Sequence, residues 1–426
     1  MNIAVLGYGV DGRATADYFK KHGHTVTIFD HFQPADLLNY KLNHFDFVFR
    51  SPSVPPYFVI HSVDSKTPTN WTSATHYFFE HCPAPIIGVT GTKGKGTTAS
   101  ITTTLMQAAG HKVHLLGNIG IPALSKLDQI KATDLVIYEL SSFQLWDLPL
   151  SPHVAVVLRI EPDHLDVHCD YQDYLTAKTN IVKHQTADDY CIYYQPNADS
   201  SRIAAASSGT KLSYPLPQPS ARLTKLLDLL PVPGEHNREN AEAALFAVAA
   251  FHQATNLEEF IAQPQHFAFL SQGLQKFTGL PHRLEFVREL NQVKYYDDNF
   301  SSAFPATDVA IAAFEDHPTV LIAGGKDRHL DLSAMQKRLF SAKNLQKIIL
   351  IGEIKEQLAA NQDPTKYQLA DNLPQALQLA RLNAEPLATV QHPAIVLMSP
   401  GAASFDMFKN FQDRGEQFQK LVRSLS

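Results

Sequence analysis

A loop rich in glycine, threonine and lysine carries the clearest chemical signal in the sequence. It follows a short apolar segment, Pro85–Val89, and precedes a predicted helix to about Ala109. Successive backbone N–H groups in such a loop, with the positive end of the following helix, bind phosphate oxygens. Lys95 adds a cation for the β- and γ-phosphates, and a hydroxyl of Thr97 or Thr98 can ligate Mg²⁺. The residues predicted to bind ATP here are Gly91, Thr92, Lys93, Gly94, Lys95, Gly96, Thr97 and Thr98.

Two polar residues follow other apolar segments. Glu139 lies at the end of Leu135–Leu140, and His164 follows Val154–Leu158. Open α/β sheets bind ligands at the carboxyl ends of their strands, where a carboxylate can hold the Mg²⁺ of a nucleotide and a histidine can assist. Taken alone, Glu139 fits a helix-capping or surface glutamate equally well, and a lone histidine such as His164 is more often structural.

The first thirty residues predict a strand, a glycine-rich turn, a helix and a second strand. Gly7, Gly9 and Gly12 have the GxGxxG spacing, and Asp30 follows the second apolar segment, Thr25–Phe29. This pattern is typical of dinucleotide binding and would fit a dinucleotide-dependent oxidoreductase. The phosphate loop argues against an oxidoreductase, because hydride transfer to a nicotinamide does not use a γ-phosphate.

The elements that position these residues are predicted to alternate between strand and helix along the whole chain. The predicted fold class is α/β, with a Rossmann-like N-terminal domain, a central P-loop ATPase domain with a mainly parallel sheet, and a C-terminal Rossmann-like domain. The predicted boundaries are residues 1–82, 83–279 and 280–426, with a hinge at Phe277–Arg283. The further predicted strands are Phe45–Phe49, Val293–Tyr296, Val320–Ala323, Lys347–Ile351 and Ala394–Met398.

Composition excludes several classes of protein. The 426 residues are 44% hydrophobic and 18% charged, which favours folded domains over disorder. A net charge of −6 gives no basic surface for nucleic acid. Three scattered cysteines fit a reducing compartment. The N-terminus does not have the pattern of a signal peptide, and no run of about 18 apolar residues occurs. We expect a cytoplasmic protein, monomeric, with no membrane or nucleic-acid partner.

Six segments, taken in order, resemble the Mur ligase family, and in particular its glutamate-adding branch. Any one is weak alone, but together with the phosphate loop and the βαβ opening they cover nearly the whole chain. They are Gly117-Asn118-Ile119-Gly120, Glu139–Leu145, Asp163-His164-Leu165-Asp166, Gly234-Glu235-His236-Asn237, Thr278–Arg283 and Ser399–Gly415.

The resemblance implies an ATP-dependent acid–amino-acid ligase that adds glutamate, in the D form, to UDP-N-acetylmuramoyl-L-alanine. The reaction would pass through an acyl phosphate and serve peptidoglycan synthesis, and with it cell shape and cell division. Lys178 matches the family's carbamylated lysine. Without the resemblance, it would be interpreted as a solvent-exposed charged side chain on a helix. Two Mg²⁺ ions are expected on Thr97, Glu139, His164 and carbamylated Lys178, with Lys95, Glu139, His164 and Lys178 as the catalytic set.

The resemblance also implies binding residues in each domain. For ATP these are Asn237 and Asn240 at the base, Arg283 at the phosphates and Asp298 at the ribose. For the UDP substrate they are Gly9, Val10, Asp11, Asp30, His31, Asn118 and His164. For the incoming amino acid they are Ser302, Arg328, Ser404 and Phe411.

The sequence departs from the family pattern at two positions. Gly96 stands where a serine or threonine usually follows the loop lysine, and Phe300 stands where a lysine is usual in the acceptor segment. The lost cation leaves open whether D-glutamate, L-glutamate or another amino acid is accepted. Two alternatives remain: a folylpolyglutamate synthetase-like ligase, which the N-terminal βαβ unit disfavours, and a nucleotide-binding protein without ligase turnover.

Overall fold

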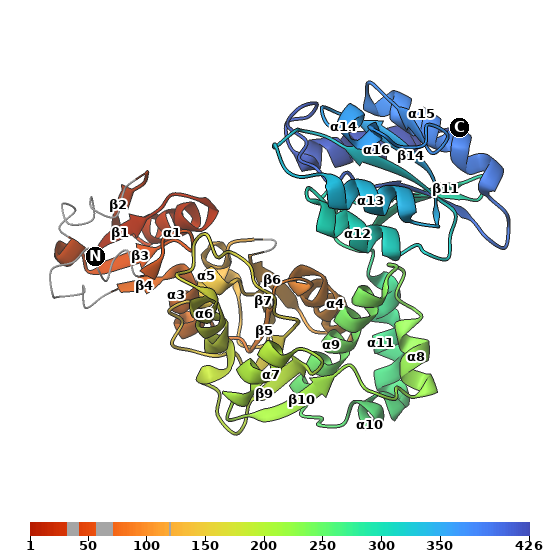
Figure 1. Ribbon diagram of the computed structural model, residues 1–426. Coiled ribbons are helices and arrows are strands. Elements are labelled where there is room, and N and C mark those ends of the chain that lie inside the picture. Colours follow the sequence, from red (N-terminus) through yellow and green to blue (C-terminus); the bar gives the residue numbers. More distant parts are fainter. Residues whose placement is uncertain (32–41, 57–70, 119–120) are drawn as a thin grey trace. The chain divides into compact units, whose positions relative to one another are not determined.

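The computed structural model describes residues 1–31, 42–56, 71–118 and 121–426. Ile119 and Gly120, the second half of one predicted motif, lie outside the described residues. The chain forms two compact units, one of Met1–Leu229 with Arg238–Lys276 and one of Leu230–Asn237 with Phe277–Ser426. Three separate sheets lie in these units (Figure 1). The prediction of an α/β fold with mainly parallel sheets is confirmed.

The first sheet is parallel, with strand order β2-β1-β3-β4. Its strands are β1 (Asn2–Leu6), β2 (Thr25–Phe29), β3 (Phe47–Arg50) and β4 (Trp71–Ser73), and its helices are α1 (Val10–Lys21) and α3 (Ala74–His81). Strand β3 begins later than predicted and includes Arg50. The Ser73 side chain accepts a hydrogen bond from His76 N and so caps α3.

The second sheet is also parallel, with strand order β10-β9-β8-β5-β7-β6. Its strands are β5 (Ile86–Thr90), β6 (Val113–Gly117), β7 (Leu135–Glu139), β8 (Val154–Val157), β9 (Tyr190–Tyr194) and β10 (Thr210–Tyr214). The associated helices are α4 (Lys95–Ala108), α5 (Ser142–Leu145), α6 (Tyr171–Lys183), α7 (Ala198–Ala205), α8 (Ala221–Leu227), α9 (Glu235–Phe251), α10 (Leu257–Ala262) and α11 (Pro264–Lys276). Because β5 lies between β7 and β8, the phosphate loop, Glu139 and the β8 loop open at one sheet edge.

The first two sheets share one apolar core. Phe19 and Phe49 of the first sheet layer belong to the same buried cluster as Leu116 and Tyr138 of the second. Two short 3-10 helices, η3 (Ala123–Ser125) and η4 (Leu127–Gln129), lie in the connection after β6. This continuous burial explains why the two predicted domains form a single compact unit.

The third sheet has strand order β11-β12-β16-β13-β14-β15, and β11 alone runs antiparallel to its neighbour. Its strands are β11 (Glu285–Leu290), β12 (Val293–Asp297), β13 (Thr319–Gly324), β14 (Leu345–Ile351), β15 (Tyr367–Leu369) and β16 (Ala394–Met398). Helices α12 (Phe304–Ala312), α13 (Ser333–Ser341) and α14 (Lys355–Ala359) bury one face, and α15 (Leu373–Ala384) and α16 (Phe411–Ser424) bury the other. This unit is therefore a three-layer α/β/α sandwich.

No helix among the described residues has the length and apolar character to cross a bilayer.

The turn after β1 explains the spacing of the first three glycines. A Cβ on Gly12 would lie 2.0 Å from the Gly7 carbonyl oxygen, whereas a Cβ on Gly9 would meet nothing within 4 Å. Gly7 has a positive φ of 84°. The helix therefore approaches the turn too closely for any side chain at Gly12.

We predict that Gly12→Ala lowers the free energy of unfolding by about 1–3 kcal/mol, because the added methyl group forces the turn and helix apart. Gly9→Ala, the matched control in the same turn, should cost less than about 1 kcal/mol. Urea unfolding followed by circular dichroism measures both. Equal losses for the two variants would show that close packing at Gly12 is not what the glycine provides.

Candidate active site at the carboxyl ends of the central strands

The phosphate loop joins β5 to α4 in the conformation that its glycines allow. Gly94 has φ 84° and forms the N-cap of α4 without a side-chain capping bond. A Cβ on Gly94 would lie 2.4 Å from the Asn240 Oδ1 atom. Lys95 Nζ donates to the carbonyl oxygens of Gly91 at 3.1 Å and Thr92 at 2.9 Å. The loop thus presents backbone N–H groups and a lysine at a helix N-terminus, as anion binding requires.

The two threonines after Gly96 differ in what their hydroxyls do. Thr98 is fully buried, and its Oγ1 donates to Asn240 Oδ1 at 3.3 Å. Thr97 is partly exposed, and its hydroxyl has no hydrogen-bond partner among the described residues. Asn240 lies against the start of α4, while Asn237 is buried and donates to Pro233 O at 2.6 Å.

Lys178 is a buried lysine on α6 that points at the same loop. Its Nζ donates to Gly91 O at 2.9 Å and Thr90 Oγ1 at 3.3 Å, and lies 4.8 Å from the centre of the Tyr174 ring. Burial holds the pKa of Lys178 well below its ordinary value, and the charge of Lys95 lowers the pKa further. The side chain therefore carries a neutral amine far more often than an exposed lysine does.

Glu139 ends β7 beside this pair of lysines. It is buried, and its Oε1 accepts a bond from Asn118 Nδ2 at 3.2 Å. His164 has a positive φ of 55°, and its ring lies 4.9 Å from that of Phe143. Its Nε2 is 3.6 Å from Asp163 Oδ2. Glu139 and Asp163 both act electrostatically on Lys178, which places acidic groups around the lysine.

Sequence reasoning missed the residues that hold α5 against α6. His168 Nε2 lies 3.0 Å from Ser142 Oγ, and its Nδ1 lies 3.0 Å from Asp173 Oδ2. The His168 ring stacks on Phe143 at 5.4 Å, and Asp173 also accepts from Trp146 Nε1 at 2.9 Å. Burial lowers the pKa of His168, which favours the neutral ring. The one feature of the sequence that pointed to His168 was its position four residues after His164.

The predicted UDP-binding residues of the first domain gather at the carboxyl ends of β1 and β2. Asp30 Oδ1 accepts from Tyr8 N at 3.1 Å, and this bond lowers the pKa of Asp30. His31 is almost fully exposed, with Nε2 3.5 Å from Asp30 Oδ2. Val10 is exposed, and burial raises the pKa of Asp11 at the start of α1. The structure brings these side chains to one edge with the Gly7–Gly12 turn.

In the second unit, Ser302 and Arg328 line the same cavity of about 350 Å³. Its other walls are mixed: apolar side chains such as Leu330 and Met335 lie beside the charged Lys326 and Asp327. Ser404 and Phe411 do not line this cavity as the described residues define it. Ser404 is buried, and Phe411 begins α16. Two of the four predicted acceptor residues thus share one cavity, and the other two lie outside its lining.

Phe300 lies beside Phe411 and under a cation. The Arg283 guanidinium carbon is 3.6 Å from the centre of the Phe300 ring, and the Phe411 ring lies edge-on at 5.1 Å. Phe300 N donates to His282 O at 2.9 Å. The aromatic ring that replaces the expected lysine therefore stacks with the arginine predicted to reach the phosphates.

Asp298 is buried and already bonded to protein groups. Its Oδ2 accepts from Ser301 Oγ at 2.5 Å and Ser399 Oγ at 2.6 Å, and its Oδ1 accepts from Leu284 N at 3.2 Å. Burial raises the pKa of Asp298 to about 6. A bond to a ribose hydroxyl would have to be added to these or replace one of them.

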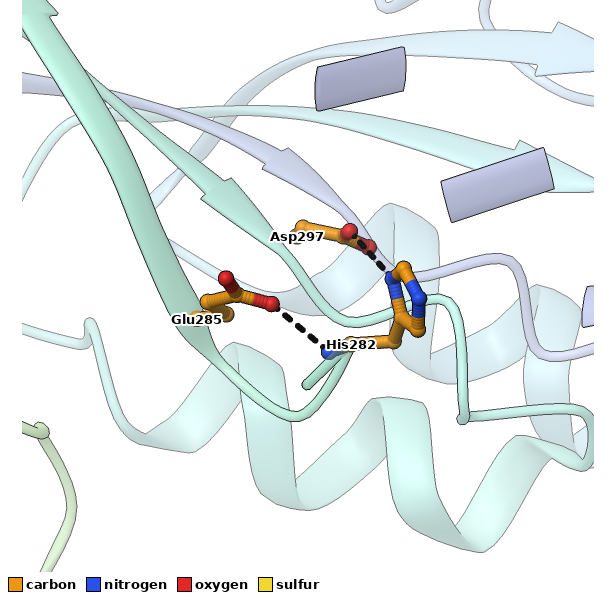
Figure 2. Close-up of side chains that lie close together, drawn as sticks. All are labelled: His282, Glu285 and Asp297. Carbon is orange, nitrogen blue, oxygen red and sulfur yellow. Dashed lines mark hydrogen bonds and ion pairs between the residues drawn. The ribbon is translucent and has the colours of Figure 1, made fainter. Parts of the chain in front are cut away.

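His282, Glu285 and Asp297 form a compact cluster that sequence reasoning also missed (Figure 2). His282 Nδ1 lies 2.7 Å from Asp297 Oδ2, and His282 N donates to Glu285 Oε2 at 2.8 Å. Gln419 Nε2 donates to both carboxylates at 2.8 Å. Protein donors thus satisfy both acids, and the cluster acts as a buried ion pair that fixes the predicted hinge to β12.

Arg414 extends this network into the acceptor segment. It is buried, and its Nε donates to Asn299 Oδ1 at 2.6 Å while Nη1 donates to Ala402 O at 3.2 Å. Asn299 in turn donates its Nδ2 to Asp297 Oδ1 at 2.6 Å. Burial lowers the pKa of Arg414 to about 10. The backbone on both sides of Phe300 is therefore held by a fixed polar network.

Comparison with known proteins decides the family. A model of the Mur ligase middle domain matches residues 89–248. The UDP-N-acetylmuramoylalanine–D-glutamate ligase of Acetivibrio thermocellus is 33% identical over 457 residues, covering 99% of this chain and 96% of that protein. The chain belongs to the Mur ligase family. The family prediction is confirmed.

Solved structures of Mur ligases share the fold. The UDP-N-acetylmuramate–alanine ligase from Thermotoga maritima aligns with a TM-score of 0.58 at 16% identity, covering 100% of this chain and 99% of that one. The D-alanyl-D-alanyl-adding ligase from Acinetobacter baumannii aligns with a TM-score of 0.59 at 17% identity, covering 82% and 78%. At this identity the likeness supports the fold alone.

The His282–Asp297 pair predicts a pH dependence of stability in this Mur ligase. The hydrogen bond to Asp297 raises the pKa of His282. The protonated ring therefore stabilises the fold fully below its unfolded pKa of about 6.5, and this contribution is lost as pH rises through the folded pKa. We expect the free energy of unfolding to fall across that window in the wild type.

His282→Gln should flatten this dependence and cost about 1.5–3 kcal/mol at pH 6, because it removes a bond to a charged group. His392→Gln, on the exposed surface of the same unit, is the matched control and should keep the wild-type slope. Urea unfolding by circular dichroism between pH 6 and about pH 8.5 measures both. An unchanged slope in His282→Gln would contradict the assignment.

Proposed function

We propose that this Mur ligase uses ATP to join glutamate to the terminal carboxylate of UDP-N-acetylmuramoyl-L-alanine. The main observation behind the proposal is that Lys95 of the phosphate loop and the buried Lys178 both donate to the Gly91 carbonyl oxygen. Glu139 acts electrostatically on Lys178 from the end of the neighbouring strand. The full-length similarity to a relative with that name supports the choice of substrate. We further propose that the reaction takes place in the cytoplasm, in peptidoglycan precursor synthesis, on a monomer.

The reaction has two steps. A carboxylate oxygen of the nucleotide substrate attacks the γ-phosphorus of ATP, ADP leaves, and an acyl phosphate forms. The amine of glutamate then attacks the acyl carbon and the C–N bond forms. The bond between the acyl carbon and the phosphate oxygen breaks, phosphate leaves with the electron pair, and the amine loses a proton. Lys95 and the N–H groups of the loop would offset charge that develops on the phosphoryl oxygens, the largest contribution expected in such sites.

The residues present fit the binding of Mg²⁺. The Thr97 hydroxyl and the Glu139 carboxylate are hard oxygen donors, and His164 adds a nitrogen at the same sheet edge. Bound there, Mg²⁺ would neutralise phosphate charge. We propose Thr97 over Thr98 as the ligand, because the Thr98 hydroxyl is committed to Asn240.

Lys178 fits carbamylation through the state of its nitrogen. A neutral amine attacks carbon dioxide, the N–C bond forms and the nitrogen loses a proton, which leaves an anionic carbamate. Burial favours the neutral amine, and the nearby Lys95 favours an anion over a second cation. The modification thus places an anion, which can support a metal, beside the positive charge of Lys95.

We propose that the second unit binds the incoming amino acid through Ser302, Arg328, Ser404 and the backbone of Phe411. Arg328 supplies the cation for the α-carboxylate at the cavity that Ser302 also lines. L-glutamate stays a second candidate, because Phe300 stands where a lysine is usual in the acceptor segment and its ring stacks with Arg283 and supplies no cation.

The test is turnover with the two glutamate enantiomers. The protein is incubated with ATP, Mg²⁺, bicarbonate and UDP-N-acetylmuramoyl-L-alanine, and phosphate release and product mass are followed with D- and L-glutamate in parallel. We expect product with D-glutamate. Product with L-glutamate alone would assign Phe300 a role in specificity, and no product with either would refute the proposed reaction.

Lys95→Met should lower turnover by about 10²–10³-fold, because it removes a cation from the reacting phosphoryl group. Lys126→Met, in the connection after β6, is the matched control and should retain wild-type turnover.

A further inference from the structure

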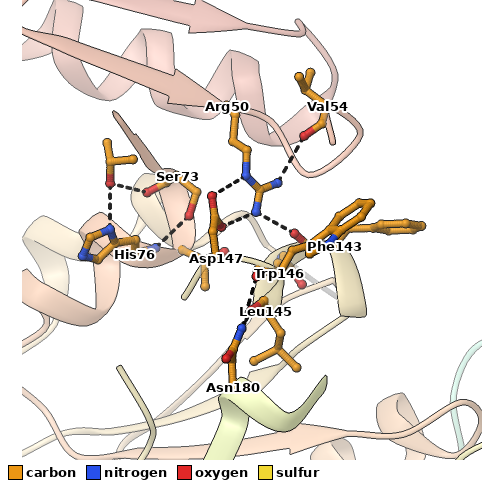
Figure 3. Close-up of polar contacts among 12 residues, drawn as sticks. Arg50, Val54, Ser73, His76, Phe143, Leu145, Trp146, Asp147 and Asn180 are labelled. Atoms are coloured by element: carbon orange, nitrogen blue, oxygen red, sulfur yellow. Dashed lines mark hydrogen bonds and ion pairs between the residues drawn. The ribbon is translucent and has the colours of Figure 1, made fainter. Parts of the chain in front are cut away.

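A buried arginine joins the first sheet to the segment that follows Glu139. Arg50, the last residue of β3, has a side chain with no exposed surface. Its Nε donates to Asp147 Oδ2 at 2.7 Å, and its Nη2 donates to Asp147 Oδ1 and, at 2.9 Å, to Phe143 O. Its Nη1 donates to Val54 O at 3.4 Å. Figure 3 shows the guanidinium held between β3 and α5.

The contact has the geometry that a buried charge requires. A guanidinium removed from water is costly unless a carboxylate and further acceptors meet its donors. The two parallel bonds to Asp147 use the planar fork of arginine, which lysine cannot reproduce. Trp71 on β4 also donates its Nε1 to Asp147 Oδ2 at 3.2 Å. Two strands of the first sheet thus hold one carboxylate of the central domain.

On the first-sheet side, the pair is one residue from the glycine turn. Ser51, which follows Arg50, donates its Oγ to Gly7 O at 2.6 Å. The same hydroxyl lies where a Cβ on Gly12 would project, at 2.8 Å. A shift of Arg50 would therefore also move the turn that the sequence predicts to bind the UDP group.

On the central side, the pair holds the short helix that follows Glu139. Asn180 on α6, two residues beyond Lys178, donates its Nδ2 to Leu145 O at 2.8 Å and Trp146 O at 3.1 Å (Figure 3). Helix α5 is thus fixed by Arg50 from the first sheet and by α6 from its own domain. With four residues, α5 makes too few internal hydrogen bonds to be stable alone.

We infer that Arg50 and Asp147 are a positioning pair: by holding the segment that follows Glu139, they set the distance between the UDP-binding turn and Glu139, a predicted metal ligand. The inference rests on the proposed function for the identity of those two sites. Arg50 touches no reacting atom; it acts through α5. Binding of the nucleotide end of the substrate then places the far end, the reacting carboxylate, against the phosphate loop.

The variants separate positioning from folding stability. Arg50→Lys keeps the charge but loses the two-bond fork, Arg50→Met removes the charge, and Asp147→Asn removes the acceptor charge with little change of shape. The matched control is Lys21→Met, because Lys21 on α1 pairs with Asp128 in η4, an exposed ion pair that joins the same two sheet layers.

Kinetic constants are measured well below the unfolding midpoint of each variant. We expect Arg50→Lys and Asp147→Asn to lower kcat/KM for the UDP substrate by about 10–100-fold, since small misplacements of reacting groups have effects of that size. The KM for ATP should stay within about twofold, and Lys21→Met should match the wild type. Lower unfolding midpoints with unchanged kinetic constants would overturn the inference.

A second readout does not depend on the reaction. Amide hydrogen exchange of residues 141–147 should rise at least about tenfold in Arg50→Lys and remain at the wild-type rate in Lys21→Met. If wild-type protein shows no ligase turnover, the proposed function fails while this exchange test still decides the inference. Unchanged exchange of α5 in both Arg50→Lys and Asp147→Asn would overturn it.

Discussion

Two lysine side-chain nitrogens bind one carbonyl oxygen, and much of the central domain holds them in place. Lys95 and Lys178 both donate to Gly91 O, at 3.1 and 2.9 Å. Lys178 is fully buried, and its nitrogen donates to two neutral oxygens, Gly91 O and Thr90 Oγ1. Like charges in a region shielded from water repel strongly, so one of them must be neutral or modified. The depressed pKa of Lys178 identifies which one.

The arrangement of the surrounding strands and helices keeps the two lysines together. Strand β5 must end beside β7 and β8 for the loop, Glu139 and His164 to open at one edge, and the parallel strand order provides that. Helix α6 must bring Lys178 under the loop, and it is fixed to α5 by Asp173 and Asn180. Through Arg50 the first sheet is held to the same short helix. The first sheet and the central strands are thus linked through one short helix.

The sequence predicted those parts that depend on local pattern. Many of the buried parallel strands, among them β5, β7, β8, β13 and β16, were predicted because their apolar runs are short and bounded by turn residues, whereas β6, β9 and β10 were not predicted. The phosphate loop was predicted because its glycines and lysine follow a strand at a fixed spacing. Strands β4 and β15 have three residues each, too few to show a period. Strand β11 was missed because its hairpin turn, Asn291-Gln292, has positive φ at both residues without the glycine that marks such turns.

The unpredicted parts of the site are contacts between distant residues. Arg50 and Asp147 are 97 positions apart, and Arg414 and Asn299 are 115 apart. No spacing rule connects such pairs, because only the completed sheets bring them together. The sequence showed that Phe300 replaces a cation of the family pattern. The structure adds that the Arg283 guanidinium stacks on the Phe300 ring. That contact depends on the hinge conformation at His282, whose φ is 61°.

The most direct test of this account is whether Lys178 holds a carbamate. Protein equilibrated with ¹³C-labelled bicarbonate at neutral pH is compared by ¹³C NMR with Lys178→Met and with Lys183→Met, an exposed lysine of the same helix. The account predicts a protein-bound carbamate signal in the wild type and in Lys183→Met that is absent from Lys178→Met. A wild type without this signal, or a signal that persists in Lys178→Met, would contradict it.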